Sequence, residues 1–216
     1  AMICRLCPRQ CGVDRARQQG RCHSGETMRV ARAALHFWEE PCLVGKGGSG
    51  AIFFTGCSLG CIYCQNRQIS RGEGGREIST EKFLSLCDRL IEQGAENINL
   101  VTGSHFAAQI AEAFRQRKPA VPVVYNCGGY ESVETLRLPE GLVDIYLPDM
   151  KYSDPQTAAN LSAAPDYPEV AQAAINEMYR QTGAPVYNEN GVLQRGVWVR
   201  HLVLPGHLEN TYGVLD

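Results

Sequence analysis

The sequence predicts an α/β fold in which the strands run parallel to one another. From residue 51 onward, short apolar runs alternate with longer segments that repeat apolar residues at helical spacing. Polar residues follow several apolar runs directly, and parallel α/β folds gather their functional side chains at these carboxyl ends of the strands. The sequence contains no internal repeat and no low-complexity segment.

Five apolar runs are typical of strands, and three longer segments are typical of helices. We expect the strands at residues 51–56, 98–102, 121–126, 143–148 and 197–204. We expect the helices at residues 80–93, 105–117 and 168–182. Gly94 and Gly183 are suited to end the first and third helices, and Ser104 is suited to cap the second.

The composition divides the chain into two parts. Residues 1–49 are cysteine-rich and irregular and end in the glycine run at 45–50, so we expect an N-terminal extension there. Residues 50–216 carry the alternating elements. A further helix and strand would be expected after the fifth strand, giving a partial (β/α)6 TIM-like barrel. That barrel would be either incomplete at its C-terminus or completed by something outside this sequence.

Bulk composition excludes several classes of function. The 216 residues are 44% hydrophobic and 20% charged, as in an ordinary globular protein. The formal net charge of −2 creates no field that favours nucleic acid or an anionic membrane. No apolar run approaches the roughly 20 residues that span a bilayer, and the N-terminus shows no signal peptide. We therefore expect a cytoplasmic protein that binds neither nucleic acid nor membrane.

Ten cysteines need an explanation in a cytoplasmic chain. Disulfides are disfavoured in a reducing compartment, so clustered cysteines there indicate metal binding or redox chemistry. Cys87 lies on the apolar face of the first helix, and we expect it in the core. The clustered cysteines form two groups, one of Cys4, Cys7, Cys11 and Cys22 and another of Cys57, Cys61 and Cys64.

The second group has the spacing Cys-x3-Cys-x2-Cys and directly follows the first strand. Three thiolates can hold a [4Fe–4S] cluster and leave one iron without a protein ligand. That iron can chelate the amino and carboxylate groups of S-adenosylmethionine (SAM). One electron from the reduced cluster can then break a carbon–sulfur bond and release a 5′-deoxyadenosyl radical. A zinc knuckle is the alternative, but the loop has no fourth cysteine or histidine nearby.

This loop, with the aromatic Tyr63 before its third cysteine, resembles the radical SAM superfamily. More closely, Cys-Ile-Tyr-Cys-Gln-Asn at 61–66, Leu-Pro-Asp-Met-Lys at 147–151 and Val-Arg-His-Leu-Val-Leu-Pro-Gly at 199–206 resemble the pyruvate formate-lyase-activating enzymes. The N-terminal Cys-Arg-Leu-Cys-Pro-Arg-Gln-Cys-Gly and the stretch Leu-His-Phe-Trp-Glu-Glu-Pro-Cys at 35–42 are similar to a less characterised branch of that family. The resemblance covers essentially the whole chain.

The resemblance implies a role for each matching position. Cys57, Cys61 and Cys64 would be the catalytic cluster ligands, and the backbone of Tyr63 would contact the adenine. Many members carry Gly-Gly-Glu after the second strand to bind the SAM amino group. Here that place holds Thr102, Gly103 and Ser104, so the glycine is present but the acid is absent. Capping of the following helix is the alternative role for Thr102 and Ser104.

Four later residues would also approach SAM. Asn126 suits the ribose hydroxyls or the methionine carboxylate, or else a turn. Asp149 and Lys151 face one side of their strand and resemble an element near the SAM methionine and a bound monovalent cation, with a plain ion pair as the alternative. His201 matches a family histidine that contacts SAM from the fifth strand. The alternative is a core histidine with protein partners.

The first cysteine group offers four ligands near the N-terminus. Four thiolates suit a structural zinc ion or a second iron–sulfur cluster. A disulfide or redox pair and four unliganded cysteines are the alternatives. The glycine run at 45–50 separates the two groups, so we do not expect them to share one cluster.

The expected function is hydrogen abstraction by the SAM-derived radical. Resemblance favours an activase that acts on a glycine backbone of a partner enzyme under anaerobic conditions, with flavodoxin or ferredoxin as electron donor. Radical modification of another peptide or of a small molecule is the second hypothesis. A non-catalytic iron–sulfur or zinc module is the third, and it would bind metal without cleaving SAM. The residues that choose a substrate lie in variable loops, so the sequence does not separate the first two hypotheses.

The spacing of the second group generates a first prediction. Anaerobic reconstitution should place an oxygen-sensitive cluster of about four irons on this loop. Cys61→Ala should lose that iron, whereas Cys42→Ser, outside both groups, should keep it. Iron content and SAM cleavage that are unchanged in Cys61→Ala would contradict the ligand assignment.

Overall fold

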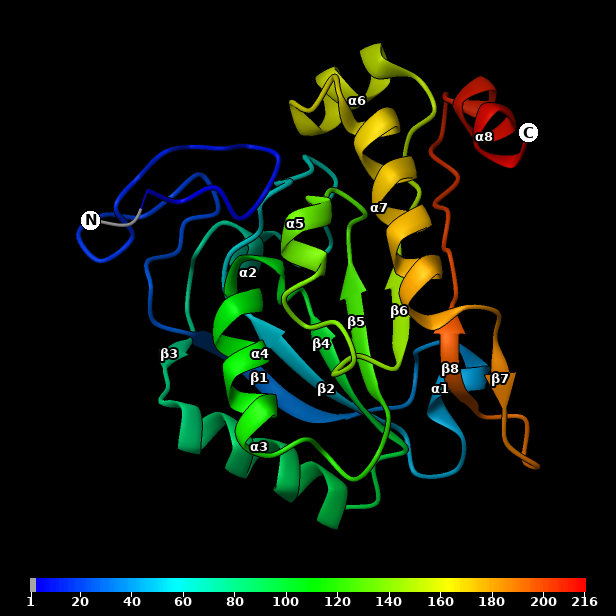
Figure 1. The fold of residues 1–216 in the computed structure, drawn as a ribbon. Helices are drawn as coiled ribbons and strands as arrows, with labels where there is room; N and C mark the ends of the chain where they lie inside the picture. The colour runs from blue at the N-terminus through cyan, green and yellow to red at the C-terminus, as the bar shows by residue number, and fades with distance from the viewer. Residues whose placement is uncertain (1–2) are drawn as a thin grey trace.

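The computed structural model describes residues 3–216. Over these residues eight strands form one sheet in the order β3-β1-β2-β4-β5-β6-β8-β7 (Figure 1). In this order, the strands are β3 (Arg76–Glu77), β1 (Arg29–His36), β2 (Ser49–Phe54), β4 (Asn97–Val101), β5 (Val123–Cys127), β6 (Ile145–Pro148), β8 (Leu193–Val197) and β7 (Val186–Tyr187).

The centre of the sheet is parallel, which confirms the predicted fold class. Strands β2, β4, β5, β6 and β8 run parallel in successive pairs. Strand β1 is antiparallel to β2, and β7 is antiparallel to β8. Within residues 3–216 the sheet is open, because β3 and β7 end it on opposite sides. This architecture is that of a partial TIM-like barrel whose parallel strands end at one edge.

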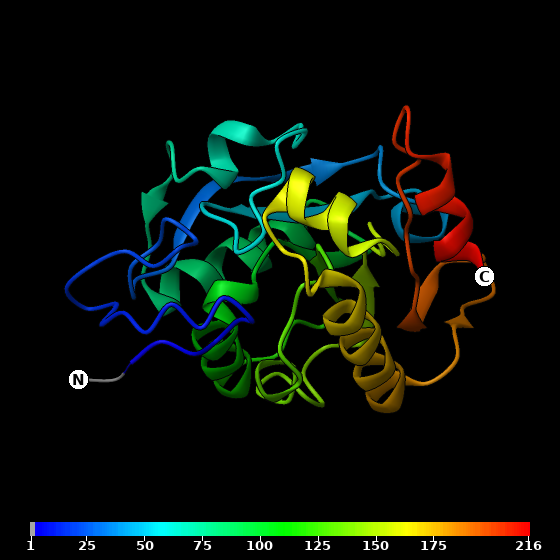
Figure 2. The ribbon, with the colours of Figure 1, turned by 90° about the horizontal axis from the view of Figure 1, so that it is seen from above.

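Helices cover one face of this sheet, as the view from above shows (Figure 2). They are α3 (Thr80–Glu92), α4 (Ala107–Gln116), α5 (Val133–Leu136) and α7 (Tyr167–Thr182). The remaining helices are α1 (Pro41–Val44), α2 (Arg67–Ser70), η1 (Ser104–Phe106), α6 (Pro155–Ser162) and α8 (Leu208–Leu215). Across residues 3–216, no helix combines the length and the apolar character that crossing a bilayer requires.

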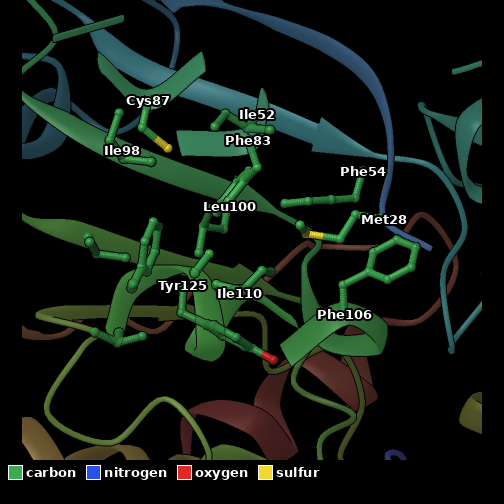
Figure 3. Packing of buried hydrophobic residues seen from close by; sticks show 14 of the residues in the cluster. Met28, Ile52, Phe54, Phe83, Cys87, Ile98, Leu100, Phe106, Ile110 and Tyr125 are labelled. Carbon is green, nitrogen blue, oxygen red and sulfur yellow. The ribbon is translucent and has the colours of Figure 1, made fainter. Parts of the chain in front are cut away.

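The main core lies between the sheet and these helices (Figure 3). Phe54 of β2 packs against Phe83 of α3 and Phe106, with ring centroids 6.0 and 5.8 Å apart. Cys87 is 2% exposed and belongs to this core, which confirms its expected role. The apolar spacing within 80–93 therefore correctly predicted the buried face of α3. Ser79 caps this helix by accepting the Lys82 N–H at 3.2 Å.

Ser104 does not cap the helix that follows it, so the capping alternative is wrong at this position. Residues 104–106 form a 3₁₀ turn, and α4 begins only at Ala107 without a side-chain cap. The Ser104 hydroxyl instead donates to Oε1 of Glu131 at 2.5 Å. Both groups are buried, and the hydrogen bond to a buried carboxyl competes successfully with capping.

The fifth strand lies earlier than expected. The apolar run 197–204 contributes only its first residue to β8, which occupies Leu193–Val197. Beyond it the chain follows β6 through single contacts: the Arg200 N–H donates to Pro148 O at 2.9 Å, and the Met150 N–H donates to Arg200 O at 2.7 Å. The side chains of Val199, Leu202 and Val203 remain about half exposed, so this apolar run does not mark a buried strand.

Part of the N-terminal segment belongs to the sheet. Residues 29–36 were expected to be irregular, but they form β1 and pair with β2 from Val30↔Phe54 to His36↔Ser49. The glycine run then makes a tight turn against the end of α3. At Gly47 a side chain would collide with the carbonyl oxygen of Gly94, so only glycine fits there.

Candidate functional site

A cavity of about 530 Å³ lies at the carboxyl ends of the parallel strands. Nine of the residues predicted to form the site line it: Cys57, Cys61, Tyr63, Cys64, Thr102, Asn126, Asp149, Lys151 and His201. They come from five separate segments of the chain, and the parallel topology brings them to one edge. Gly103 and Ser104 are not among the lining residues.

The cysteine loop follows β2 and is held by hydrogen bonds to neighbouring segments of the chain. The carbonyl of Thr55 accepts hydrogen bonds from Ser24 Oγ at 3.0 Å and from His105 Nε2 at 2.9 Å. Burial lowers the pKa of His105 to about 4, so this ring is neutral and its Nε2–H can donate. The N–H of Cys57 donates to Cys22 O at 3.2 Å. The loop is therefore fixed where it leaves the strand.

The donor set fits a [4Fe–4S] cluster. Three free thiols line one cavity, and in a cubane each cysteine binds a different iron. They need not converge on one point, and among residues 3–216 no three side chains of His, Cys, Asp or Glu do converge closely enough to hold a single metal ion. Burial raises the pKa of Cys57, while the backbone N–H groups of Gly60 and Leu59 oppose this rise and would stabilise a bound thiolate.

A chain of hydroxyl groups ends at the sulfur of Cys61. Ser162 Oγ donates to Cys61 Sγ at 3.0 Å, Tyr152 OH lies 2.7 Å from Ser162 Oγ, and Tyr63 OH lies 2.6 Å from Tyr152 OH. Burial raises the pKa of Tyr152 to about 12, so the hydroxyl stays protonated at neutral pH. Sequence reasoning missed Tyr152, although it follows the Asp-Met-Lys motif directly, and missed Ser162, which no pattern marks.

Asp149 and Lys151 form an ion pair and also line the cavity. Lys151 Nζ lies 2.5 Å from Asp149 Oδ2. Burial would lower the pKa of Lys151, but the Asp149 carboxylate and the nearby Cys61 together outweigh burial and raise the pKa. The ion pair that we had treated as an alternative is therefore present, and it stands at the cavity wall.

Arg200 joins the ends of three segments in this cavity. Its guanidinium donates to Asp149 Oδ1 at 2.9 Å, to Asn126 Oδ1 at 2.6 Å and to Glu39 Oε1 at 3.0 Å. A longer contact of 3.4 Å reaches Glu40 Oε1. Sequence reasoning gave Arg200 no role, although the Val-Arg-His motif contains it. Asn126 lies within β5 and has partners on both sides, so the turn alternative for it is wrong.

Glu39 holds its proton unusually strongly. Burial and the hydrogen bond to Glu40 raise the pKa of Glu39 to about 7, against the attraction of Arg200. Its Oε2 accepts N–H groups from Asn99 at 2.9 Å and from Asn126 at 3.2 Å. Sequence reasoning placed Glu39 in a family-like stretch but did not expect its side chain to reach the strand ends.

Three predicted residues have partners that bear on their roles. His201 lies beyond β8, not inside a strand as expected; its Nδ1 is 2.7 Å from Met150 O and its Nε2 is 3.0 Å from Thr211 Oγ1. Both ring nitrogens therefore have protein partners, as in the core-histidine alternative. Ser104 bonds to Glu131. A side chain at Gly103 would meet Ile110 Cδ1 at 2.7 Å, so this glycine faces the core.

The first cysteine group lies beside the loop of the second. Cys7 and Cys22 are buried, whereas Cys4 and Cys11 are partly exposed, and all four are free thiols. A methyl group at Gly20 would lie 3.2 Å from Cys11 Sγ and 3.6 Å from Cys22 Sγ. Cys22 O also accepts the N–H of Cys57, so residues of the two cysteine groups are in direct contact. The glycine run at 45–50 separates the two groups in sequence but not in space.

The fold thus places three free thiols in one cavity at the strand ends of a parallel α/β sheet. The family model of the radical SAM superfamily matches residues 51–211, and the chain belongs to that superfamily. It is accordingly an enzyme of the class that cleaves SAM at a [4Fe–4S] cluster.

The chain is also similar, over most of its length, to a longer protein. The uncharacterized protein MJ0674 of Methanocaldococcus jannaschii is 28% identical over 214 residues, which are 95% of this chain and 58% of that protein. The chain thus spans less than two thirds of the length of this relative. The similarity covers more of the chain than residues 51–211, so it extends into part of the segment before residue 51.

The raised pKa of Glu39 generates a prediction about stability. A carboxyl with a higher pKa in the folded chain binds more protons when folded, so the free energy of unfolding falls as pH rises from 4.5 to about 7. This difference is worth at most about 3 kcal/mol. Glu39→Gln should remove the part of this decrease in the free energy of unfolding that Glu39 causes. Urea unfolding at several pH values between 4.5 and about 7 measures it.

Two comparisons make that measurement specific. Glu131, whose pKa burial also raises to about 7, keeps its share of the slope in the Glu39→Gln protein. Glu92→Gln, on the exposed side of α3, should leave the slope as it is. A Glu39→Gln slope equal to that of the unchanged protein would show that Glu39 ionises normally in the fold.

Proposed function

We propose that this enzyme activates a partner protein by abstracting a hydrogen atom from a glycine of its backbone. The observation that carries the proposal is the apolar rim of the cavity. Trp38 is 91% exposed and Leu202 is 50% exposed, and both line the cavity. A tryptophan left in water at the mouth of a site is typical of a surface that another protein covers.

The polar wall of the cavity suits SAM. Cys57, Cys61 and Cys64 would hold the cluster, which with SAM supplies one-electron cleavage and a radical that abstracts hydrogen. Asp149 and Asn126 offer oxygens to an ammonium group, and Lys151 offers a cation to a carboxylate. Arg200 fixes the Asp149 and Asn126 side chains through its own hydrogen bonds. Gly103, Ser104 and His201 stay predicted SAM contacts, although protein atoms already contact each of them in this structure.

The proposal includes an electron donor and a compartment. A reduced flavodoxin or ferredoxin would supply the electron, and the exposed side of the loop around Ile62, which is 58% exposed, is open to such a donor. Ten free cysteines favour a reducing cytoplasm. An oxygen-sensitive cluster favours anaerobic conditions.

A second candidate is radical modification of another peptide or of a small molecule. The cavity volume of about 530 Å³ supports it, because ligand pockets of roughly 300–1,000 Å³ accommodate small molecules. The two candidates differ in product. An activase leaves a persistent radical on a protein, whereas the alternative consumes SAM and releases a changed molecule.

The decisive experiment incubates the reduced, reconstituted chain anaerobically with SAM and candidate partners and records EPR spectra. The proposal predicts a glycyl-radical signal that disappears when the reacting glycine is replaced by alanine. Trp38→Ser should raise the partner concentration needed for half-maximal signal by about tenfold, or about 1.4 kcal/mol of docking energy. Tyr179→Ser, an exposed residue on α7 that does not line the cavity, should not. SAM cleavage that modifies another substrate and never gives this signal would support the second candidate instead.

We also propose that the first cysteine group binds an iron–sulfur cluster through four thiolates, because cluster ligands need not converge on one point as the ligands of a single zinc ion must. Among residues 3–27, only Cys7, Cys22 and Ser24 are buried, so this segment has no apolar core of its own. Irregular segments of this kind are commonly stabilised by a bound zinc ion or iron–sulfur cluster. Five arginines and one aspartate occupy residues 4–22, and this excess of positive charge suits an anionic thiolate site.

Metal analysis tests this second site separately from the first. In a chain with Cys57, Cys61 and Cys64 replaced by alanine, iron with sulfide should still assemble a cluster and protect four thiols from alkylation, whereas Zn²⁺ alone should not. Further replacement of Cys4 and Cys22 by serine should abolish binding, whereas Cys42→Ser should not. No metal bound in the triple variant would refute the site.

A further inference from the structure

Arg9 links the N-terminal cysteine segment to the loop that carries the second cysteine group. Its guanidinium donates to Ser58 O at 3.0 Å and to Leu59 O at 3.2 Å, two carbonyls between Cys57 and Cys61. It also donates to Ser162 O at 2.7 Å and to Ala163 O. One side chain thus satisfies four backbone acceptors from two segments about 100 residues apart in sequence.

The second of these segments ends α6 and reaches the sulfur of Cys61. Carbonyl groups at a helix C-terminus lack partners within the helix and carry partial negative charge, so a guanidinium is a favourable partner. Ala163 is left-handed, with φ 48° and ψ 42°, a conformation that residues with a Cβ avoid. Holding this turn also holds Ser162, whose hydroxyl donates to Cys61 Sγ at 3.0 Å.

The position of Arg9 is itself fixed. Its guanidinium lies 5.0 Å from the centroid of the Tyr130 ring, and Tyr130 OH donates to Asp166 at 2.7 Å. The turn that contains Arg9 closes with the Gln10 N–H donating to Cys7 O at 2.9 Å. A planar fork between four carbonyls and an aromatic face is a geometry that lysine does not reproduce.

We propose that Arg9 is a positioning residue that holds the Cys57–Cys61 segment and Ser162 in the arrangement the cluster requires. It acts through backbone carbonyls and touches no reacting atom. The proposal gives the N-terminal cysteine segment a purpose in the radical SAM site whether or not that segment binds metal. It rests on the proposed ligand role of Cys57, Cys61 and Cys64 only for its second readout.

The first readout needs no cluster. In the apo chain, Arg9→Ala should accelerate amide hydrogen exchange at least about tenfold at residues 57–63 and 159–164. Arg17→Ala is the matched control, because Arg17 is an exposed arginine of the same segment whose ion pair reaches only Asp14. Ethylguanidinium should restore protection in Arg9→Ala by occupying the vacated site, which a general loss of stability would not allow.

The second readout uses the reconstituted protein. The reduced cluster of Arg9→Ala should lose iron to a chelator faster and show a broadened EPR signal, and Arg9→Lys should fall between it and the unchanged protein. If Arg9→Ala does not fold, Arg9→Lys carries the comparison by the same two measurements. Exchange and chelation rates equal to those of Arg17→Ala, without an effect of ethylguanidinium, would overturn the proposal. If Arg9→Ala accelerates exchange as predicted but the unchanged protein never cleaves SAM, the positioning role of Arg9 stands and only the proposed function is contradicted.

Discussion

The loop after β2 presents three sulfurs to one cavity because other segments take up its backbone hydrogen bonds. Ser24 and His105 donate to Thr55 O, and the Cys57 N–H donates to Cys22 O. An irregular loop has no ladder or helix of its own to satisfy these groups, and leaving them unpaired away from water would cost about 1–3 kcal/mol each. The N-terminal segment therefore belongs to the architecture of the site as much as the barrel strands do.

A second part of the cavity wall depends on one partly buried cation. Arg200 connects carboxylate and amide groups at the ends of β5, β6 and the segment before α1. Removing a partner from such a network leaves a partly buried charge without compensation, which costs more than an exposed ion pair contributes. The raised pKa of Glu39, about 7, leaves this carboxyl partly protonated near neutral pH, which limits the negative charge gathered around Arg200. Under the proposed function, a polar, preorganised wall of this kind would orient the charged end of SAM while the apolar rim would meet the partner protein.

Sequence alone predicted the parallel fold and the residues that stand directly at strand ends. Cys57, Asn126, Asp149 and Lys151 were found because a strand followed by polar residues places them at one edge. Arg200 and Glu39 were missed as site residues because their roles come from contacts 161 residues apart, which no local pattern encodes. The fifth strand was misplaced because the apolar run at 197–204 is only partly buried, so its hydrophobicity did not indicate which residues pair with the neighbouring strand. Ser104 was assigned to a cap because local capping rules do not foresee a buried carboxyl from another segment.

The most direct test of the account is an anaerobic structure of the reconstituted chain with SAM. The account predicts a cluster on Cys57, Cys61 and Cys64, with the methionine end of SAM in the cavity against Asn126, Asp149 and Lys151. SAM bound outside this cavity, or a cluster held by Cys4, Cys7, Cys11 and Cys22 while the β2 loop stays free of metal, would contradict it.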